Sequence, residues 1–155
     1  MKKILVISTS PRRGSNSEAL AEAFASSARE AGHEVELVSL RGKDVQFCRG
    51  CFVCQETQRC VIHDDADTLR QKALEADVLV FATPIYYYEM SGQLKTLLDR
   101  FNPLFPSDYA FRDVYMLTAA AEDDLYVPQR AVSGLEGWIE CFDEARLAGS
   151  VFMGG

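Results

Sequence analysis

The sequence of 155 residues has no apolar run long enough to cross a membrane. The apolar stretch at residues 4–7 is also too short for the core of a secretory signal. Positive charge is scarce, because 16 Lys and Arg residues stand against 23 Asp and Glu residues, a formal net charge of −7. Nucleic acids and membrane surfaces are polyanions, so this balance argues against either as a partner. We therefore expect a cytoplasmic protein that binds anions only through a local set of donors.

Several nucleotide-binding and catalytic patterns are missing as well. The dinucleotide motif G-x-G-x-x-G does not occur, and no Gly-Lys-Ser/Thr sequence opens a helix as in nucleoside triphosphate-binding loops. The only two histidines, His33 and His63, lack the partner residues of a metal site or of an activated nucleophile. We therefore predict no catalytic acid, base or nucleophile among the side chains.

Apolar runs and helical patterns alternate along the chain. The apolar runs predict five strands, at residues 4–7, 34–38, 78–82, 114–117 and 150–153. Apolar residues recur at helical spacing at residues 17–31, 65–76, 92–101 and 129–147. This alternation predicts an open three-layer α/β sandwich with a five-stranded parallel sheet, in one domain over residues 1–155. The helix that usually follows the fifth strand is missing, so we expect either a truncated chain or a second subunit on the uncovered apolar strip.

The loop after the first strand, residues 9–17, is rich in hydrogen-bond donors. Loops at the carboxyl ends of parallel strands form the ligand sites of open α/β sheets. Free N–H groups at a helix N-terminus bind phosphate, and two adjacent arginines add positive charge. We predict that a phosphate is held by Ser10, Arg12, Ser15, Asn16 and Ser17. The alternative is a polar turn in which Ser15 or Asn16 only caps the helix.

Two further loops leave the carboxyl ends of predicted strands. Three consecutive tyrosines, residues 86–88, cannot all enter one core, so some must present flat faces to solvent or to a planar ligand. The alternative is a loop that one buried tyrosine clamps. In the third loop, which begins at residue 118, small residues let backbone amides approach a ring. A phosphate site beside an aromatic loop meets the requirements of FMN, and we predict that its ring lies against Thr83, Pro84, Ile85, Tyr86, Tyr87, Thr118, Ala119 and Ala120.

Four segments together resemble one protein family. They are Ser10-Pro11-Arg12-Arg13-Gly14-Ser15-Asn16-Ser17, Thr83-Pro84-Ile85-Tyr86, Ser91-Gly92-Gln93-Leu94-Lys95 and Asp99-Arg100. Their order and spacing resemble the flavodoxin-like NAD(P)H-dependent FMN reductases. The resemblance implies a parallel sheet of order 2-1-3-4-5, bound FMN, and a homodimer or homotetramer in which a neighbouring subunit borders the flavin.

Four of the five cysteines are crowded into a short segment with the spacing C-x2-C-x2-C-x5-C. Because cytoplasmic thiols are kept reduced, such crowding points to metal or redox chemistry before structural disulfides. The spacing resembles the compact motif of the iron-sulfur flavoproteins, a branch of the same superfamily, and implies a [4Fe–4S] cluster on Cys48, Cys51, Cys54 and Cys60. Free or redox-active thiols and a zinc ion remain alternatives. We predict that Cys141 is a small core residue on the last helix.

The leading functional interpretation is an FMN-dependent oxidoreductase. It would pass electrons from NAD(P)H through the flavin to a quinone, a small oxidant or an iron-sulfur cluster. One alternative is a non-enzymatic flavin and iron-sulfur electron carrier or redox-responsive module. Another is a binding module that has lost its cofactor.

Overall fold

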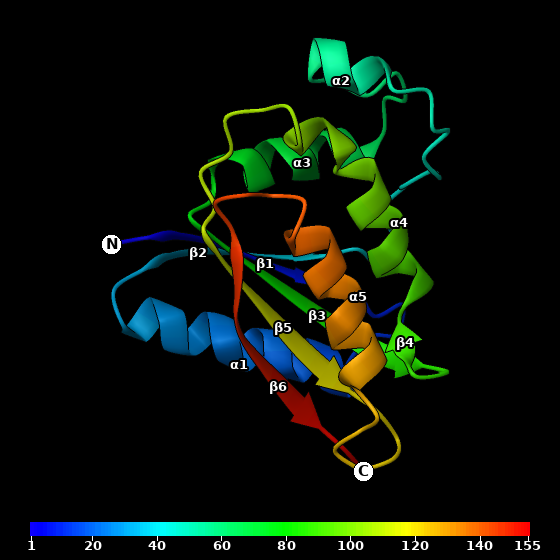
Figure 1. Ribbon diagram of the computed structural model, residues 1–155. Helices are drawn as coiled ribbons and strands as arrows, with labels where there is room; N and C mark the ends of the chain where they lie inside the picture. The colour runs from blue at the N-terminus through cyan, green and yellow to red at the C-terminus, as the bar shows by residue number, and fades with distance from the viewer.

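The computed structural model describes residues 1–155 as a central sheet with helices on both faces (Figure 1). The strands are β1 Lys3–Ser8, β2 Glu34–Ser39, β3 Val78–Tyr86, β4 Glu89–Met90, β5 Asp113–Ala119 and β6 Arg146–Met153. The helices are α1 Asn16–Glu30, α2 Val53–Thr57, α3 Asp65–Glu75, α4 Gly92–Arg100 and α5 Gln129–Ile139, with a 3-10 turn, η1, at Asn102–Leu104. The sequence patterns did not predict α2, β4 or η1, each of which is five residues or shorter.

The five long strands form one parallel sheet. Their order is β2-β1-β3-β5-β6, and the short β4 pairs antiparallel with the end of β3. Counted without β4, this order is 2-1-3-4-5, which confirms the predicted flavodoxin-like sheet. The strands in the middle are apolar on both faces, as a parallel sheet covered by helices requires.

The two faces of the sheet pack against different helices. Strand residues of one face, such as Val6 and Val80, contact the small side chains Ala21 and Ala25 of α1. The alternate residues, such as Phe81, point to the opposite face and pack under α3, α4 and α5. Figure 1 shows α1 alone on its side and the other three long helices together, so the predicted three-layer sandwich is confirmed.

The last helix is shorter than predicted. It ends at Ile139 rather than at residue 147, and the chain then forms tight turns in which Phe142 N donates to Ile139 O. Residues 146–147 instead begin β6, where Arg146 pairs with Asp113 of β5 both in the sheet register and through its side chain. Strand pairing in the sheet thus decides the conformation of residues 146–147, although their apolar spacing is that of a helix. Consequently Cys141 lies beyond the helix and is exposed, so its predicted place in the core is wrong.

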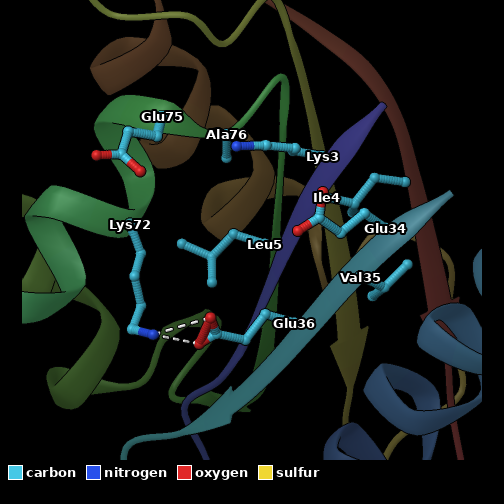
Figure 2. Close-up of a pocket in the computed structure, with 9 residues that line it drawn as sticks. All are labelled: Lys3, Ile4, Leu5, Glu34, Val35, Glu36, Lys72, Glu75 and Ala76. Carbon is cyan, nitrogen blue, oxygen red and sulfur yellow. Dashed lines mark hydrogen bonds and ion pairs between the residues drawn. The ribbon is translucent and has the colours of Figure 1, made fainter. Parts of the chain in front are cut away.

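The edge strand β2 is covered by charged side chains. Figure 2 shows a groove beside it in which Lys72 of α3 reaches Glu36 of β2, with Nζ–O distances of 2.8 and 2.5 Å. The groove has a volume of about 400 Å³ and is bounded by the first halves of β1 and β2. It therefore lies away from the carboxyl ends of the strands, where parallel sheets bind ligands.

None of the helices combines the length and the apolar character that crossing a bilayer would require.

Candidate functional site

The loops after β1 and β3 meet at the carboxyl ends of their strands, a region called the carboxyl edge below. Thr9, the first residue after β1, donates through its N and its Oγ1 to Ala82 O of β3, at 2.9 and 2.8 Å. Its Oγ1 also lies 3.1 Å from Oγ of Ser91, the residue that caps α4. These buried contacts bring together two of the three loops in which the flavin site was predicted.

The loop between β1 and α1 presents free donors. Ser15 caps α1 by accepting a hydrogen bond from Glu18 N at 3.2 Å, as the alternative interpretation expected. The N–H groups of Asn16 and Ser17, in the first turn of the helix, have no acceptor within the protein. A hydroxyl that accepts one hydrogen bond still has its own proton to donate. Capping and anion binding by Ser15 are therefore compatible.

Two residues that the sequence patterns did not single out hold this loop in shape. Glu18 accepts a hydrogen bond from Gly14 N at 2.8 Å and two from the Arg41 guanidinium at 3.1 and 3.2 Å. The hydrogen bonds from Arg41, followed by that from Gly14, lower the pKa of Glu18. Arg12 and Arg13 are exposed and form no ion pair. They are therefore available to an anion at the carboxyl edge.

The three tyrosines form an exposed hairpin. Tyr87 and Tyr88 connect β3 to β4 with φ angles of 49° and 66°, the left-handed conformation of a two-residue turn of type I′. Aromatic residues seldom adopt this conformation, which costs about 1–3 kcal/mol per residue. Tyr87 is 99% exposed, whereas Tyr88 stacks on Tyr126 with ring centroids 6.0 Å apart. The prediction that the tyrosines cannot all enter the core is confirmed.

The hairpin and the loop after β5 line one groove of about 510 Å³, within the usual range of small-molecule sites. Its lining includes four of the residues predicted to contact the ring, Ile85, Tyr86, Tyr87 and Ala120, and also Tyr88, Ala121, Glu122 and Val127. The sequence analysis missed Ala121, Glu122 and Val127, because no pattern marks loop residues that become neighbours only in the folded chain.

Three other predicted ring contacts lie in the interior of the protein. Thr83 is buried and holds the start of α4, because its Oγ1 accepts from Ser91 N at 2.9 Å. Thr118 and Ala119 are buried in β5. Ala120 lines the groove, and its N–H donates to Met153 O at 3.1 Å, so this amide is already paired within the protein.

The four clustered cysteines lie at the other end of α4. They belong to residues 46–62, called the cysteine segment below, which includes α2 and packs beside η1. In Figure 1, α2 stands apart from the sheet, next to the end of α4 that is remote from β4. The nine residues of α4 span about 13 Å. The predicted flavin loops and the cysteines are therefore separated by the length of this helix.

All four cysteines line one cavity, called the cysteine cavity below. The cavity is narrow, about 20 Å³, and a groove of about 580 Å³ shares part of its lining, including Cys48 and Asn102. Cys141 lines only the larger groove. No three thiols, imidazoles or carboxylates are grouped closely enough to hold a single metal ion. The sulfurs thus surround a cavity rather than a point.

Hydrogen-bond donors face three of these sulfurs. Gly50 N donates to Cys48 Sγ and Ile62 N to Cys60 Sγ, both at 3.4 Å, and Asn102 Nδ2 donates to Cys54 Sγ at 3.3 Å. Cys54 is buried, and burial raises the pKa of its thiol.

A buried ion pair fastens both ends of the cysteine segment. Arg100 and Asp64 have side chains that are 1% and 0% exposed, and their two parallel hydrogen bonds measure 2.7 and 3.0 Å. Arg100 also donates to Gln46 O at 2.9 Å and to Ile62 O at 3.2 Å. Asp64 accepts from Gln46 N and caps α3 by accepting from Ala66 N.

The charges of this pair support each other. Burial alone raises the pKa of Asp64, but hydrogen bonds from Arg100, Gln46 and Ala66 outweigh it, and the pKa is lowered. Burial alone lowers the pKa of Arg100, but Asp64 and Cys60 outweigh it, and the pKa is raised. Both groups are therefore charged at neutral pH.

Comparison with known proteins identifies the family. Residues 2–140 match the NADPH-dependent FMN reductase family. Iron-sulfur flavoprotein MJ1083 of Methanocaldococcus jannaschii is 39% identical over 102 residues, which are 66% of this chain and 53% of that protein. This chain thus corresponds to little more than half the length of that relative.

Two further proteins extend the comparison. The putative NAD(P)H-dependent FMN-containing oxidoreductase YwqN of Bacillus subtilis is 30% identical over 129 residues, 78% of this chain and 68% of that protein. The structure of an azoreductase from Bacillus anthracis superposes with a TM-score of 0.75 at 18% identity, covering 100% of this chain and 88% of that one. The superposition shows that the fold is shared. The resemblance predicted from the motifs is confirmed: the chain belongs to the NADPH-dependent FMN reductase family, in its iron-sulfur flavoprotein branch.

Proposed function

We propose that this chain is the flavin-binding part of an FMN-dependent oxidoreductase that takes electrons from NAD(P)H and passes them to a quinone or another small acceptor. The observation that carries the proposal is the carboxyl edge, where a helix N-terminus with free amides lies on the same sheet edge as a groove with aromatic walls. Membership of the FMN reductase family supports it.

The residues of the carboxyl edge suit the two parts of FMN. In a protein of net charge −7, a phosphate needs local donors, and the N–H groups of Asn16 and Ser17, the Ser15 hydroxyl and the exposed Arg12 provide them. Ser10 contributes indirectly, because its Oγ accepts from Arg12 N at 3.2 Å and shapes the loop. Glu18 and Arg41 keep the loop in place before the ligand arrives.

The groove of the hairpin would hold the ring system. Ile85, Tyr86 and Tyr87 line it on one side, next to Pro84, and Ala120 and Ala121 line it on the other. Small alanine side chains allow a flat ligand to approach the backbone, while the tyrosines exclude water from its face. When bound, FMN supplies hydride and electron transfer chemistry, and the protein supplies position and electrostatics.

We further propose that Cys48, Cys51, Cys54 and Cys60 bind a [4Fe–4S] cluster. Four thiols around one cavity are the donor set of such a cluster, and N–H···S hydrogen bonds of the kind seen here tune its potential. A zinc ion needs its four ligands about 2.3 Å from one point. The shared cavity and the N–H···S hydrogen bonds support the four cysteines as cluster ligands, and a [4Fe–4S] cluster takes one thiolate on each of its four irons.

Reconstitution tests the flavin function. Chain purified without oxygen should bind one FMN and, with a quinone present, oxidise NADH or NADPH catalytically. Bound FMN without turnover would favour the electron carrier. A preparation that stays colourless after FMN is added would overturn both the oxidoreductase and the electron carrier. It would favour the remaining alternative, a binding module that has lost its cofactor.

Single cysteine variants test the cluster. Replacing any one of Cys48, Cys51, Cys54 or Cys60 by Ser should remove iron and acid-labile sulfide together and leave FMN bound, because the two sites lie at opposite ends of α4. Cys141→Ser, at a residue outside the cysteine cavity, is the matched control and should keep its iron. Zinc without sulfide in the wild-type chain, or no metal at all, would contradict the cluster.

A further inference from the structure

Arg100, the last residue of α4, makes four hydrogen bonds through its two terminal nitrogens. Its Nη1 donates to Gln46 O and to Asp64 Oδ2, and its Nη2 donates to Ile62 O and to Asp64 Oδ1. These contacts reach the first and the last residue of the cysteine segment. Burying a charged pair costs desolvation free energy that its mutual attraction often only balances, so stability alone is a weak reason for this arrangement.

One donor of the guanidinium remains unused. Arg100 Nε is buried and has no hydrogen-bond partner, although buried donors in folded proteins are nearly always paired. The same side chain lines the cysteine cavity together with all four cysteines. Arg100 Nη2 donates to Ile62 O, two residues beyond Cys60, which lines the same cavity. The unpaired donor and the positive charge therefore belong to the wall of the cysteine cavity.

We propose that Arg100 is a positioning residue of the cysteine site, which holds both ends of the cysteine segment together and places its positive charge in the wall of the cysteine cavity. The first part of this role exists before any cluster binds, because it consists of contacts to the protein backbone and to Asp64. The second part rests on the proposed cluster.

The role has two physical consequences. Fastening residues 46 and 62 to one rigid side chain reduces the number of arrangements that the four sulfurs can adopt, which prepares them for a shared ligand. A cation beside a thiolate ligand stabilises the more negative, reduced form of a cluster, so Arg100 raises the reduction potential.

Hydrogen exchange of the metal-free chain tests the first consequence. Arg100→Gln removes the charge and the two parallel hydrogen bonds, so amide exchange in residues 46–62 should become about tenfold faster or more, while exchange in β1 and α1 stays unchanged. Because the single variant leaves Asp64 buried and unpaired, the double variant Asp64→Asn with Arg100→Gln provides a second test with no orphaned charge. Unchanged exchange in a folded variant would overturn the fastening role.

The reduction potential of the anaerobically reconstituted cluster tests the second consequence. Arg100→Gln should make the potential more negative, and Arg100→Lys, which keeps the charge, should restore it towards the wild-type value. Arg112→Gln, at a half-exposed arginine paired with Glu144, is the matched control and should leave both readouts unchanged. Equal potentials in the Lys and Gln variants would show that the charge has no part in the role and would overturn it.

The two proposals fail differently. Wild-type chain that takes up no iron or sulfide contradicts the cluster and with it the charge effect. The exchange experiment on the metal-free chain still decides whether Arg100 fastens the segment.

Discussion

The two ends of α4 are built on opposite principles. Before its first residue the chain forms an exposed hairpin, in which Tyr87 and Tyr88 occupy strained conformations and one ring lies wholly in solvent. At its last residue, Arg100 and Asp64 are fully buried and hydrogen-bonded to each other and to the backbone.

The difference follows from what each end is proposed to bind. FMN would be held by groups that the protein itself leaves unsatisfied, such as the free amides of α1 and the open faces of the tyrosines. A cluster would be held by covalent ligands on a segment with one five-residue helix, and such a segment needs anchoring from outside. The hairpin before α4 therefore contains backbone conformations that lower the stability of the fold. The end of α4 at Arg100 instead depends on a buried ion pair whose desolvation costs free energy.

The largest effect is expected from Asp64→Ala. It leaves Arg100 charged, buried and without its carboxylate, and it removes the cap of α3, so the free energy of unfolding should fall by about 3–5 kcal/mol. Urea denaturation monitored by circular dichroism measures this change. Glu36→Gln, which breaks the exposed pair with Lys72 in Figure 2, should cost less than about 1 kcal/mol. Similar losses in both variants would contradict the contrast between buried and exposed pairs.

At the carboxyl edge, Arg12→Ala combined with Ser15→Ala should weaken FMN binding tenfold or more. Each lost hydrogen bond to a charged phosphate is worth about 1.5–3 kcal/mol. The loss of the Ser15 cap should also lower stability by about 1 kcal/mol, without unfolding the chain. Titration of the apo-protein with FMN measures the affinity, with Arg29→Ala at the other end of α1 as the control. An unchanged dissociation constant in the folded double variant would remove this loop from the site.

The pH dependence of stability should also differ between the cysteine segment and the carboxyl edge. The folded-state pKa of Asp64 is lowered, so its contribution is complete above the ordinary carboxyl pKa of about 4 and is lost as the pH falls through the folded value. Asp64→Asn should therefore flatten the loss of stability with acidification below about pH 4. Glu18→Gln should act in the same direction but less, because its partner Arg41 is partly exposed. An acid denaturation profile that neither variant alters would refute the assignment of this pH dependence to Asp64 and Glu18.

The smallest effect is expected from Tyr87→Asn. Asparagine tolerates the left-handed conformation of a type I′ turn, and the fully exposed Tyr87 ring has no packing to lose, so the chain should become more stable by up to about 1 kcal/mol. Thermal unfolding measures the gain. The same variant should bind FMN less tightly, since Tyr87 lines the groove. Tyr87→Phe keeps the aromatic face and is the control; a loss of stability in Tyr87→Asn would show that the turn is not strained.

Much of the fold could be predicted because it depends on local apolar patterns. The continuous apolar runs of β1 and β3 identified buried strands, and the helical spacing of residues 65–76 identified α3. The prediction failed where two patterns compete. Helical spacing beyond Ile139 suggested a longer helix, but pairing with β5 draws residues 146–147 into β6.

The sequence by itself determined the residues to which the proposals assign the chemistry: the donor-rich loop after β1, the three tyrosines and the four spaced cysteines are visible as composition and spacing within short segments. Only the tertiary structure decided how these groups are held and how far apart they lie. Arg41 reaches Glu18 across 23 positions and Arg100 reaches Asp64 across 36, and no periodicity links such residues. Likewise, α4 separates the carboxyl edge from the cysteine cavity. The positions of its two ends are fixed by the core against which the helix packs, and not by the residues beside them in the chain.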